Sequence, residues 1–299
     1  MQSQHVAARA AVTAIGAVAC FAVLDAMGKL LVARYPAELL VWVRYVVQTF
    51  TLLLLLGPRM GRSLVATRAL PLQLVRGALM ATSSVMMVIA FSAMPLADAT
   101  AINFAAPSIV MVLAFLFLHE RVTPVRLASV MAGLVGVLLI VRPGTSVFQP
   151  IALLPLGTAL AAATYQVITR KLADEDARTM LFYASVVGAI AFTAFMPWRG
   201  LTELPPWTDC LQFVLLGWLA AAGHFLFIRA FQQAPASGLA SITYVQLVFA
   251  TLFGLAIFGD FPDGWTLLGM AIITVSGLFL TLYERRRHIV RDAEPPAVD

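Results

Sequence analysis

Long runs of apolar residues, separated by short polar or turn-forming segments, recur along the whole chain. A helix of about 20 apolar residues is needed to cross the roughly 30 Å hydrocarbon core of a bilayer. Such runs, read between charges and Pro or Gly residues, predict ten helical spans. Their expected bounds are 10–33, 37–56, 72–92, 96–118, 125–141, 150–171, 179–197, 210–230, 236–258 and 265–283. Strands of a membrane barrel are shorter and alternate in polarity, so the pattern favours a helical bundle.

The composition excludes a soluble fold. Of the 299 residues, 61% are apolar and only 12% are charged, and the mean hydropathy is +0.90. A soluble domain typically has about 45–50% apolar and about 25% charged residues. So few charges could not cover the surface of a soluble protein of this length without large exposed apolar patches. Soluble enzymes, nucleic-acid-binding proteins and disordered chains are therefore excluded, and the expected surroundings are a lipid bilayer.

The distribution of Lys and Arg predicts the orientation in the membrane. With the N-terminus in the cytoplasm, 15 of the 20 basic residues fall on the cytoplasmic side and 4 on the other, with Arg44 inside the second span. Arg76 is counted here with the cytoplasmic residues. Because positive charge favours the cytoplasmic side, we expect a multi-pass protein of the cytoplasmic (inner) membrane with both termini in the cytoplasm. The first apolar run is too long for a signal peptide and is taken as the first span. Cys20 and Cys210 match no disulfide framework or metal spacing.

The two halves of the chain are similar at a constant offset of 140 residues. The matched pairs include Gly77 with Gly217, Pro95 with Pro235, Phe104 with Tyr244, and Glu120 with Asp260. Each half holds five predicted spans. Because five is odd, the second copy is expected to be inserted upside down, and inverted repeats are typical of secondary transporters.

Several segments carry a recognisable pattern. In the first half they are Phe91–Ala99 with Pro107, Leu118–Thr123, and Gly133–Ile140; weaker counterparts in the second half are Ala230–Pro235, Phe258–Asp260 and Ser276–Leu278. Together they resemble the EamA repeat of the drug/metabolite transporter superfamily, although Asp260 stands where that family usually has Glu. The segments around Asp25 and Arg44 resemble a bacterial subgroup labelled as S-adenosylmethionine-uptake-like.

The resemblance implies the architecture and the mode of action. We expect an all-α integral membrane protein with ten transmembrane helices in two inverted five-helix repeats, 8–143 and 149–284, followed by a cytoplasmic tail at 285–299. Helices one to four and six to nine would surround a central cavity, with helices five and ten at the periphery. Alternating access by a single chain is the implied mechanism.

Charged residues inside the first two spans are the leading site candidates. A charge at mid-bilayer costs at least about 2.5 kcal/mol and needs a partner or a water-filled cavity. Asp25 and Lys29 are spaced i,i+4 on one face of the first span, and Arg44 enters the second span at a depth similar to that of Asp25. Three interpretations stay open: a gate or a clamp for a zwitterionic substrate, a structural pair between Asp25 and Arg44, and snorkelling of Arg44 to the outer surface.

Uncharged polar residues in the other spans complete the predicted substrate-binding or gating set. They are Ser84 in the third span, Asn103 in the fourth, Tyr165 and Gln166 in the sixth, His224 in the eighth, and Tyr244 and Gln246 in the ninth. Gln166 lies near the position that corresponds to Asp25 in the other half. Amides beside aromatic rings suit an organic substrate, while hydrogen bonds between helices are the structural alternative. Ser84 bonding to its own helix is a further alternative.

These features lead to two functional hypotheses. The leading one is a secondary transporter, not an enzyme, that moves amino-acid-like, nucleoside-like or amphiphilic metabolites as a monomer or homodimer. It needs no cofactor or metal, and no Walker A motif or catalytic triad is present. Coupling to protons through Asp25 or His224 and uncoupled exchange both stay open. The alternative is a non-transporting membrane scaffold or receptor-like subunit. Glu120 and Asp260 are interpreted as loop architecture at helix ends.

Overall fold

The protein is described by a computed structural model that covers residues 2–118, 123–142, 149–172, 174–195, 205–233 and 245–293. Over these ranges the secondary structure is helical, without a strand. The α-helices are α1 (Gln2–Val32), α2 (Ala37–Met60), α3 (Leu70–Ala93), α4 (Leu96–Asn103), α5 (Ala106–Leu118), α6 (Pro124–Val141), α7 (Leu153–Lys171), α8 (Ala177–Phe195), α9 (Trp207–Gln233), α11 (Val245–Phe253) and α12 (Gly264–Ala293). Shorter helical turns are η1 (Gly61–Val65), η2 (Pro150–Ala152) and η4 (Gly254–Phe258).

Most helices begin and end within a few residues of the predicted spans. Seven helical stretches are long and apolar enough to cross a membrane, and three more apolar helices, at Leu127–Val141, Val245–Phe258 and Gly264–Leu280, are shorter. The turn signals mark the boundaries: Pro36 directly precedes α2 and Pro95 directly precedes α4, where a missing N–H costs no helical hydrogen bond. The predicted ninth span begins before residue 245, outside the described residues.

The predicted fourth span is not one continuous helix. α4 ends at Asn103 and α5 begins at Ala106, with a turn at Phe104 and Ala105 between them. Pro107 explains the break, because it has no N–H to give to the carbonyl of the residue four positions earlier. The turn is closed by a bond from the Ala105 N–H to the Ile102 carbonyl at 3.0 Å. Two half-helices therefore replace the expected single span, and the interruption lies halfway along it.

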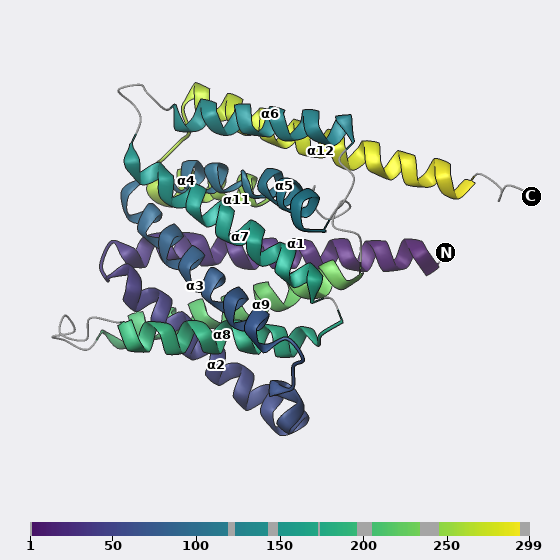
Figure 1. The fold of residues 1–299 in the computed structure, drawn as a ribbon. Helices are drawn as coiled ribbons and strands as arrows, with labels where there is room; N and C mark the ends of the chain where they lie inside the picture. Colours follow the sequence, from purple (N-terminus) through teal and green to yellow (C-terminus); the bar gives the residue numbers. More distant parts are fainter. Residues whose placement is uncertain are drawn as a thin grey trace, which may run out of the picture.

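The helices pack as a bundle with two recognisable ends (Figure 1). α1 begins and α12 ends at the same end, which we call the proximal end. The opposite end, where α1 leads into α2 and η4 leads into α12, is the distal end. α6 and α12 pack against each other at one edge of the bundle, while α1 packs against α9 and α3 against α7.

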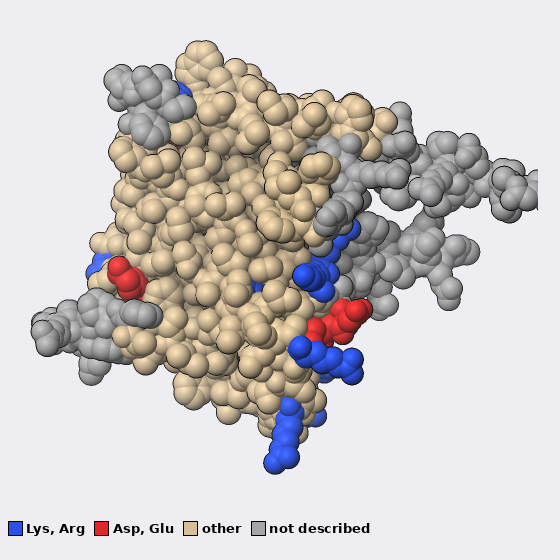
Figure 2. Space-filling model, in the orientation of Figure 1, with Lys and Arg blue, Asp and Glu red and all other residues tan. Residues whose placement is uncertain are grey.

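The outer surface is apolar. Large hydrophobic side chains lie exposed along the helices, among them Val12, Leu54 and Phe117 at 70%, 74% and 69% exposure. Figure 2 shows a broad face made of uncharged residues, with almost all of its visible charged side chains near the edges. An apolar belt between two charged rims matches the layers of a bilayer, so the protein is a multi-pass membrane protein.

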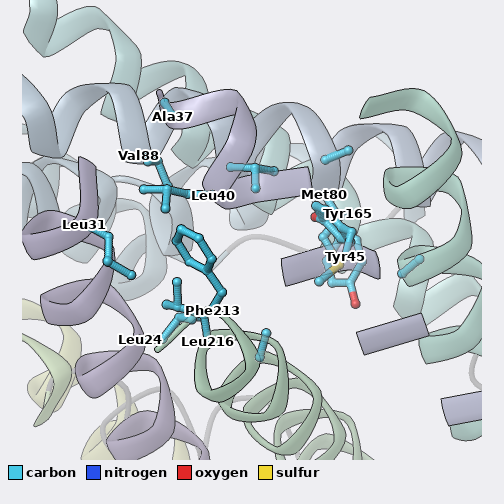
Figure 3. Packing of buried hydrophobic residues seen from close by; sticks show 14 residues of the cluster. Leu24, Leu31, Ala37, Leu40, Tyr45, Met80, Val88, Tyr165, Phe213 and Leu216 are labelled. Carbon is cyan, nitrogen blue, oxygen red and sulfur yellow. The ribbon is translucent and has the colours of Figure 1, made fainter. Parts of the chain in front are cut away.

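The largest buried cluster lies where α1, α2, α3, α7 and α9 meet (Figure 3). Tyr45, Leu31 and Ala184 in this cluster are fully buried, and Phe213 and Leu216 reach into it from α9. Such packing places the polar residues described next inside the bundle, away from lipid. Polar side chains there must find partners within the protein, because the surroundings offer no water.

Residues separated by 140 positions make equivalent close contacts. A Cβ added to Gly77 would lie 2.7 Å from Val187, and a Cβ added to Gly217 would lie 2.4 Å from Val47. Gly77 and Gly217 are one matched pair of the two halves, and Val47 and Val187 are another. The two helix crossings are therefore counterparts, and at both of them glycine permits the close approach.

Candidate functional site

A small cavity lies between α1, α2, α3 and α9. It has a volume of about 20 Å³, which is room for about one water molecule. Its lining residues are Leu24, Asp25, Gly28, Leu40, Val41, Arg44, Val88, Phe91 and Leu216. Asp25 and Arg44 are the charged members of this lining, so an otherwise apolar cavity holds one acid and one base. We refer to it as the distal cavity, because it lies toward the distal end of α1 and α2.

Asp25 receives a hydrogen bond from the second half of the chain. The Gln246 amide, in the first turn of α11, donates to Asp25 Oδ2 at 3.0 Å. Asp25 lies in the first half and Gln246 in the second, 221 residues apart. Both residues were predicted site members, and the structure brings them together. The polar contact therefore joins the two halves beside the distal cavity.

Arg44 has donors with nothing to bind. Its Nε and Nη2 atoms are buried and have no hydrogen-bond partner among the described residues, while the guanidinium lies 5.0 Å from the centre of the Tyr45 ring. No ion pair joins Arg44 to Asp25 within the part of the chain that the structure describes. One turn along α2, Gln48 is fully buried and both its amide atoms lack partners. Leaving buried polar groups unpaired is costly, so this face of α2 is suited to a polar ligand.

The other predicted residues fall into three groups. Ser84 donates to the Met80 carbonyl at 2.8 Å, as expected of Ser in a helix, and its Oγ also lies 3.0 Å from the Tyr45 hydroxyl. His224 packs edge-on against Phe21, with 4.8 Å between ring centres. Gln166 is half-buried on α7. Tyr244 lies outside the described residues.

The half-helix α4 carries unsatisfied polar atoms near the break in the fourth span. Asn103 Oδ1, Thr100 Oγ1 and Asp98 Oδ1 are buried without a hydrogen-bond partner among the described residues. Asn103 was predicted, whereas Asp98 and Thr100 were not. Asp98 could have been found as an acid three residues after Pro95, inside the apolar run. Interrupted helices with exposed polar groups form binding sites in many transporters.

Lys29 does not face the distal cavity with Asp25. Its ammonium forms an ion pair with Asp260 at 2.8 Å, donates to the Met94 carbonyl at 3.2 Å and lies 4.7 Å from the Phe258 ring centre. Asp260, interpreted from the sequence as loop architecture, is thus the partner of a predicted site residue. The pair joins α1 to the loop after η4, at the distal end.

Two more ion pairs join the halves at the distal end. Arg34, after α1, pairs with Asp209 at the start of α9 at 3.0 Å, and the Tyr35 hydroxyl donates to the same carboxylate at 2.6 Å. Arg142, after α6, pairs with Asp263 at the start of α12. The hydrogen bond from Arg142 lowers the pKa of Asp263 to about 2. Both pairs, like Lys29–Asp260, connect residues before position 143 to residues after position 148.

Arg76 was missed as a site residue. The sequence count assigned it to a cytoplasmic loop, but it is fully buried within α3. Its guanidinium donates to the Tyr165 hydroxyl at 3.1 Å, to Thr169 Oγ1 at 3.4 Å and to the Met180 carbonyl, and lies 5.0 Å from the centre of the Tyr165 ring. The missed signal is that a single charge stands inside the apolar run that begins at residue 72. Tyr165, a predicted residue, is thus part of a second polar cluster, toward the proximal end.

Comparison with known families and proteins agrees with this architecture. The sequence model of the EamA-like transporter family matches residues 8–142 and again residues 149–283. A solved crystal structure aligns with a TM-score of 0.64 and 18% sequence identity, covering 95% of this chain and 98% of that one. At that identity the structural likeness shows the fold alone.

Curated relatives carry the names of transporters. The chain is 29% identical over 179 residues to a riboflavin transporter of Vibrio cholerae, an alignment that spans 58% of each protein. It is 27% identical over 227 residues to an S-adenosylmethionine uptake transporter of Rickettsia bellii, covering 76% of this chain and 77% of the relative. It is also 27% identical over 263 residues to a pseudopaline exporter of Pseudomonas aeruginosa, covering 87% and 92%.

Proposed function

The chain belongs to the EamA-like transporter family, and on that premise we propose that it is a secondary transporter of small organic metabolites in the cytoplasmic membrane. The curated relatives, named as importers and exporters of different compounds, support a transporter. The substrate site we propose is the distal cavity with the Asp25–Gln246 contact at its edge. The single observation that carries this assignment is the buried Arg44 guanidinium, whose free donors share an apolar cavity with the Asp25 carboxylate.

The proposed substrate class follows from these two charges. Arg44 presents unpaired donors that suit a carboxylate, and Asp25 presents an acceptor that suits an ammonium or another cationic group. A zwitterion with an apolar body would satisfy both groups and fill the apolar lining. S-adenosylmethionine, which has an amino-acid head, is therefore the first compound to test.

The proposed mechanism is alternating access by two inverted repeats. The two family matches, the equivalent contacts of Gly77 and Gly217, and five predicted spans in each half support this arrangement. Because the cavity has room for only about one water molecule, substrate entry requires the surrounding helices to separate. The three ion pairs at the distal end connect the halves. In our proposal they hold that end closed and break when it opens.

The proposed orientation places the proximal end, and with it both termini, in the cytoplasm. The count of basic residues supports it, since positive charge is retained on the cytoplasmic side. The distal end would then face the outside of the cell. A reporter fused after Asp299 that is active only outside would refute this orientation.

Counterflow in proteoliposomes tests the function. Purified protein is reconstituted with unlabelled S-adenosylmethionine, methionine or riboflavin inside, and uptake of the labelled compound is followed. We expect one of these to be exchanged. Arg44→Ala and Asp25→Ala should each lower its flux by about tenfold or more, because each removes a charge-assisted contact worth about 1.5–3 kcal/mol.

The matched control is Leu54→Ala, because Leu54 lies on α2 like Arg44 but is 74% exposed toward lipid. Its flux should stay within about twofold of the native protein, since surface substitutions change stability by about 0.5 kcal/mol or less. Normal flux in both Arg44→Ala and Asp25→Ala would refute the site. No exchange of any compound across a wider metabolite panel would refute the transporter assignment.

A further inference from the structure

The distal cavity has a counterpart in the other half of the chain. Adding 140 to Asp25 and Leu40 gives Tyr165 and Met180, and subtracting 140 from Leu216 gives Arg76. In the distal cavity, Asp25, Leu40 and Leu216 surround open space.

Contacts elsewhere in the fold support this correspondence. The Gly77–Val187 and Gly217–Val47 contacts exchange under the same shift. So do contacts between α6 and α12: a Cβ on Gly133 would lie 4.0 Å from Ser276 Oγ, and one on Gly136 would lie 2.7 Å from Ile273. Positions 140 residues apart are thus equivalent in space at two separate helix interfaces.

In the counterpart, the space is filled by an arginine side chain. Arg76 donates to the Tyr165 hydroxyl at 3.1 Å and to the Met180 carbonyl, so it contacts the counterparts of Asp25 and Leu40 directly. It also reaches Thr169, the counterpart of Lys29, at 3.4 Å. The Arg76 side chain is fully buried. A guanidinium therefore occupies the place that is open in the distal cavity, where the shorter Leu216 leaves room.

The partners of Arg76 are neutral. The three acceptors are a phenol, an alcohol and a carbonyl, and no carboxylate forms an ion pair with Arg76 among the residues that the structure describes. Its Nε has no partner. One turn earlier on α3, Gln73 is fully buried and both atoms of its amide lack partners. A buried guanidinium binds a carboxylate more strongly than it binds neutral oxygens, so this cluster is suited to receive an anionic group.

We propose that the cluster of Arg76, Tyr165, Thr169 and the Met180 carbonyl is a second subsite of the transport path, which binds the anionic group of the substrate. This rests on the proposed function and extends it: the acidic group would be held by Arg44 in the distal cavity and by Arg76 toward the proximal end. In the present structure the guanidinium itself closes this proximal subsite. A substrate anion entering it would replace the neutral acceptors of Arg76.

Charge-selective thiol labelling tests the subsite without requiring a known substrate. Cys20 and Cys210 are replaced by Ala, and a single cysteine is introduced at Ile168, three residues from Tyr165, or at its counterpart Gly28 in the distal cavity. A Cβ at Gly28 meets no atom within 4 Å, so that reporter fits. Purified protein is treated with sulfonatoethyl methanethiosulfonate, an anion, or trimethylammonioethyl methanethiosulfonate, a cation of similar size. Mass spectrometry follows both rates.

The informative quantity is the ratio of the anionic rate to the cationic rate. At Ile168→Cys this ratio should fall about fivefold or more when Arg76 is changed to Leu or Gln, and should be retained in Arg76→Lys, because nearby charge sets the local concentration of each reagent. At Gly28→Cys the ratio should stay within about twofold in the Arg76 variants and fall in Arg44→Leu. A monodisperse elution profile and an unchanged Gly28→Cys ratio show that a variant is folded.

Two results would overturn the subsite. One is an Ile168→Cys ratio that does not respond to Arg76→Leu or Arg76→Gln. The other is an Ile168→Cys thiol that reacts with neither reagent after the arginine is removed, since the space would then admit no anion. Neither result depends on flux, so failure of the subsite and failure of the transporter assignment are separate outcomes.

Discussion

The Lys29–Asp260 ion pair predicts an unequal response to the removal of its two charges. The Lys29 side chain is 13% exposed and the Asp260 side chain 39% exposed. Asp260→Asn leaves a mostly buried ammonium with only the Met94 carbonyl and the Phe258 ring as strong partners. Lys29→Met leaves a carboxylate that water can reach. The variant that keeps the buried charge should therefore be the less stable one.

The size of the effect follows from the exposure. Breaking a fully buried pair by removing one partner costs about 3–5 kcal/mol, and the exposure of Asp260 reduces that figure. The Phe258 ring retains about 0.5–1 kcal/mol of attraction for the ammonium. We therefore expect Asp260→Asn to lower the free energy of unfolding by about 1–2 kcal/mol. For Lys29→Met we expect a loss of about 0–1 kcal/mol.

Unfolding of the purified protein in mixed micelles by increasing SDS measures both losses, and the double variant completes a cycle. Lys29→Met with Asp260→Asn should be more stable than Asp260→Asn alone, because the ammonium without a partner is gone. The reasoning is refuted if Lys29→Met costs as much as Asp260→Asn, or if the two losses simply add.

Two further predictions concern helix ends and helix crossings. The pKa of Asp263 is lowered to about 2, first by the hydrogen bond from Arg142, so its stabilisation is complete above its ordinary pKa of 3.8 and is lost as the pH falls toward 2. In thermal unfolding, Asp263→Ala should be less stable than the native protein by a constant amount from about pH 8 to about pH 5, and a difference that grows on acidification would contradict this. Gly217→Ala should cost about 1–3 kcal/mol, because its Cβ would lie 2.4 Å from Val47. Val47→Ala should restore part of that loss, while Gly28→Ala, the control, should cost nothing; an equal loss in both glycine variants would show that packing is not the cause.

Membrane class and most helix bounds could be predicted from the sequence because they depend on local properties. An apolar run of sufficient length forms a helix in lipid wherever it lies in the fold, and Pro residues such as Pro36 and Pro95 mark its ends. The break at Phe104 and Ala105 was missed for a related reason. Pro107 removes one backbone hydrogen bond, but whether a helix bends or breaks there depends on the helices packed around it.

The site was predicted as a set of residues without their partners. Asp25, Arg44 and Gln246 were singled out because polar groups in an apolar run need a purpose, and that reasoning needs no fold. The alternative of an Asp25–Arg44 pair was geometrically allowed, yet the recorded partner of Asp25 is Gln246. Arg76 was assigned to a loop because one charge near the end of a run looks like a boundary, and only its full burial reveals the second cluster.

The sequence by itself determined that this chain lies in a membrane, that its two halves are related, and which side chains are too polar for lipid. These follow from hydropathy and spacing, which act over a few residues. Only the tertiary structure decided which of those side chains meet: Lys29 with Asp260 across 231 residues, and Gln246 with Asp25 across 221. Such pairings depend on how whole helices cross and tilt, and a shift of one turn, about 5.4 Å, would exchange every partner.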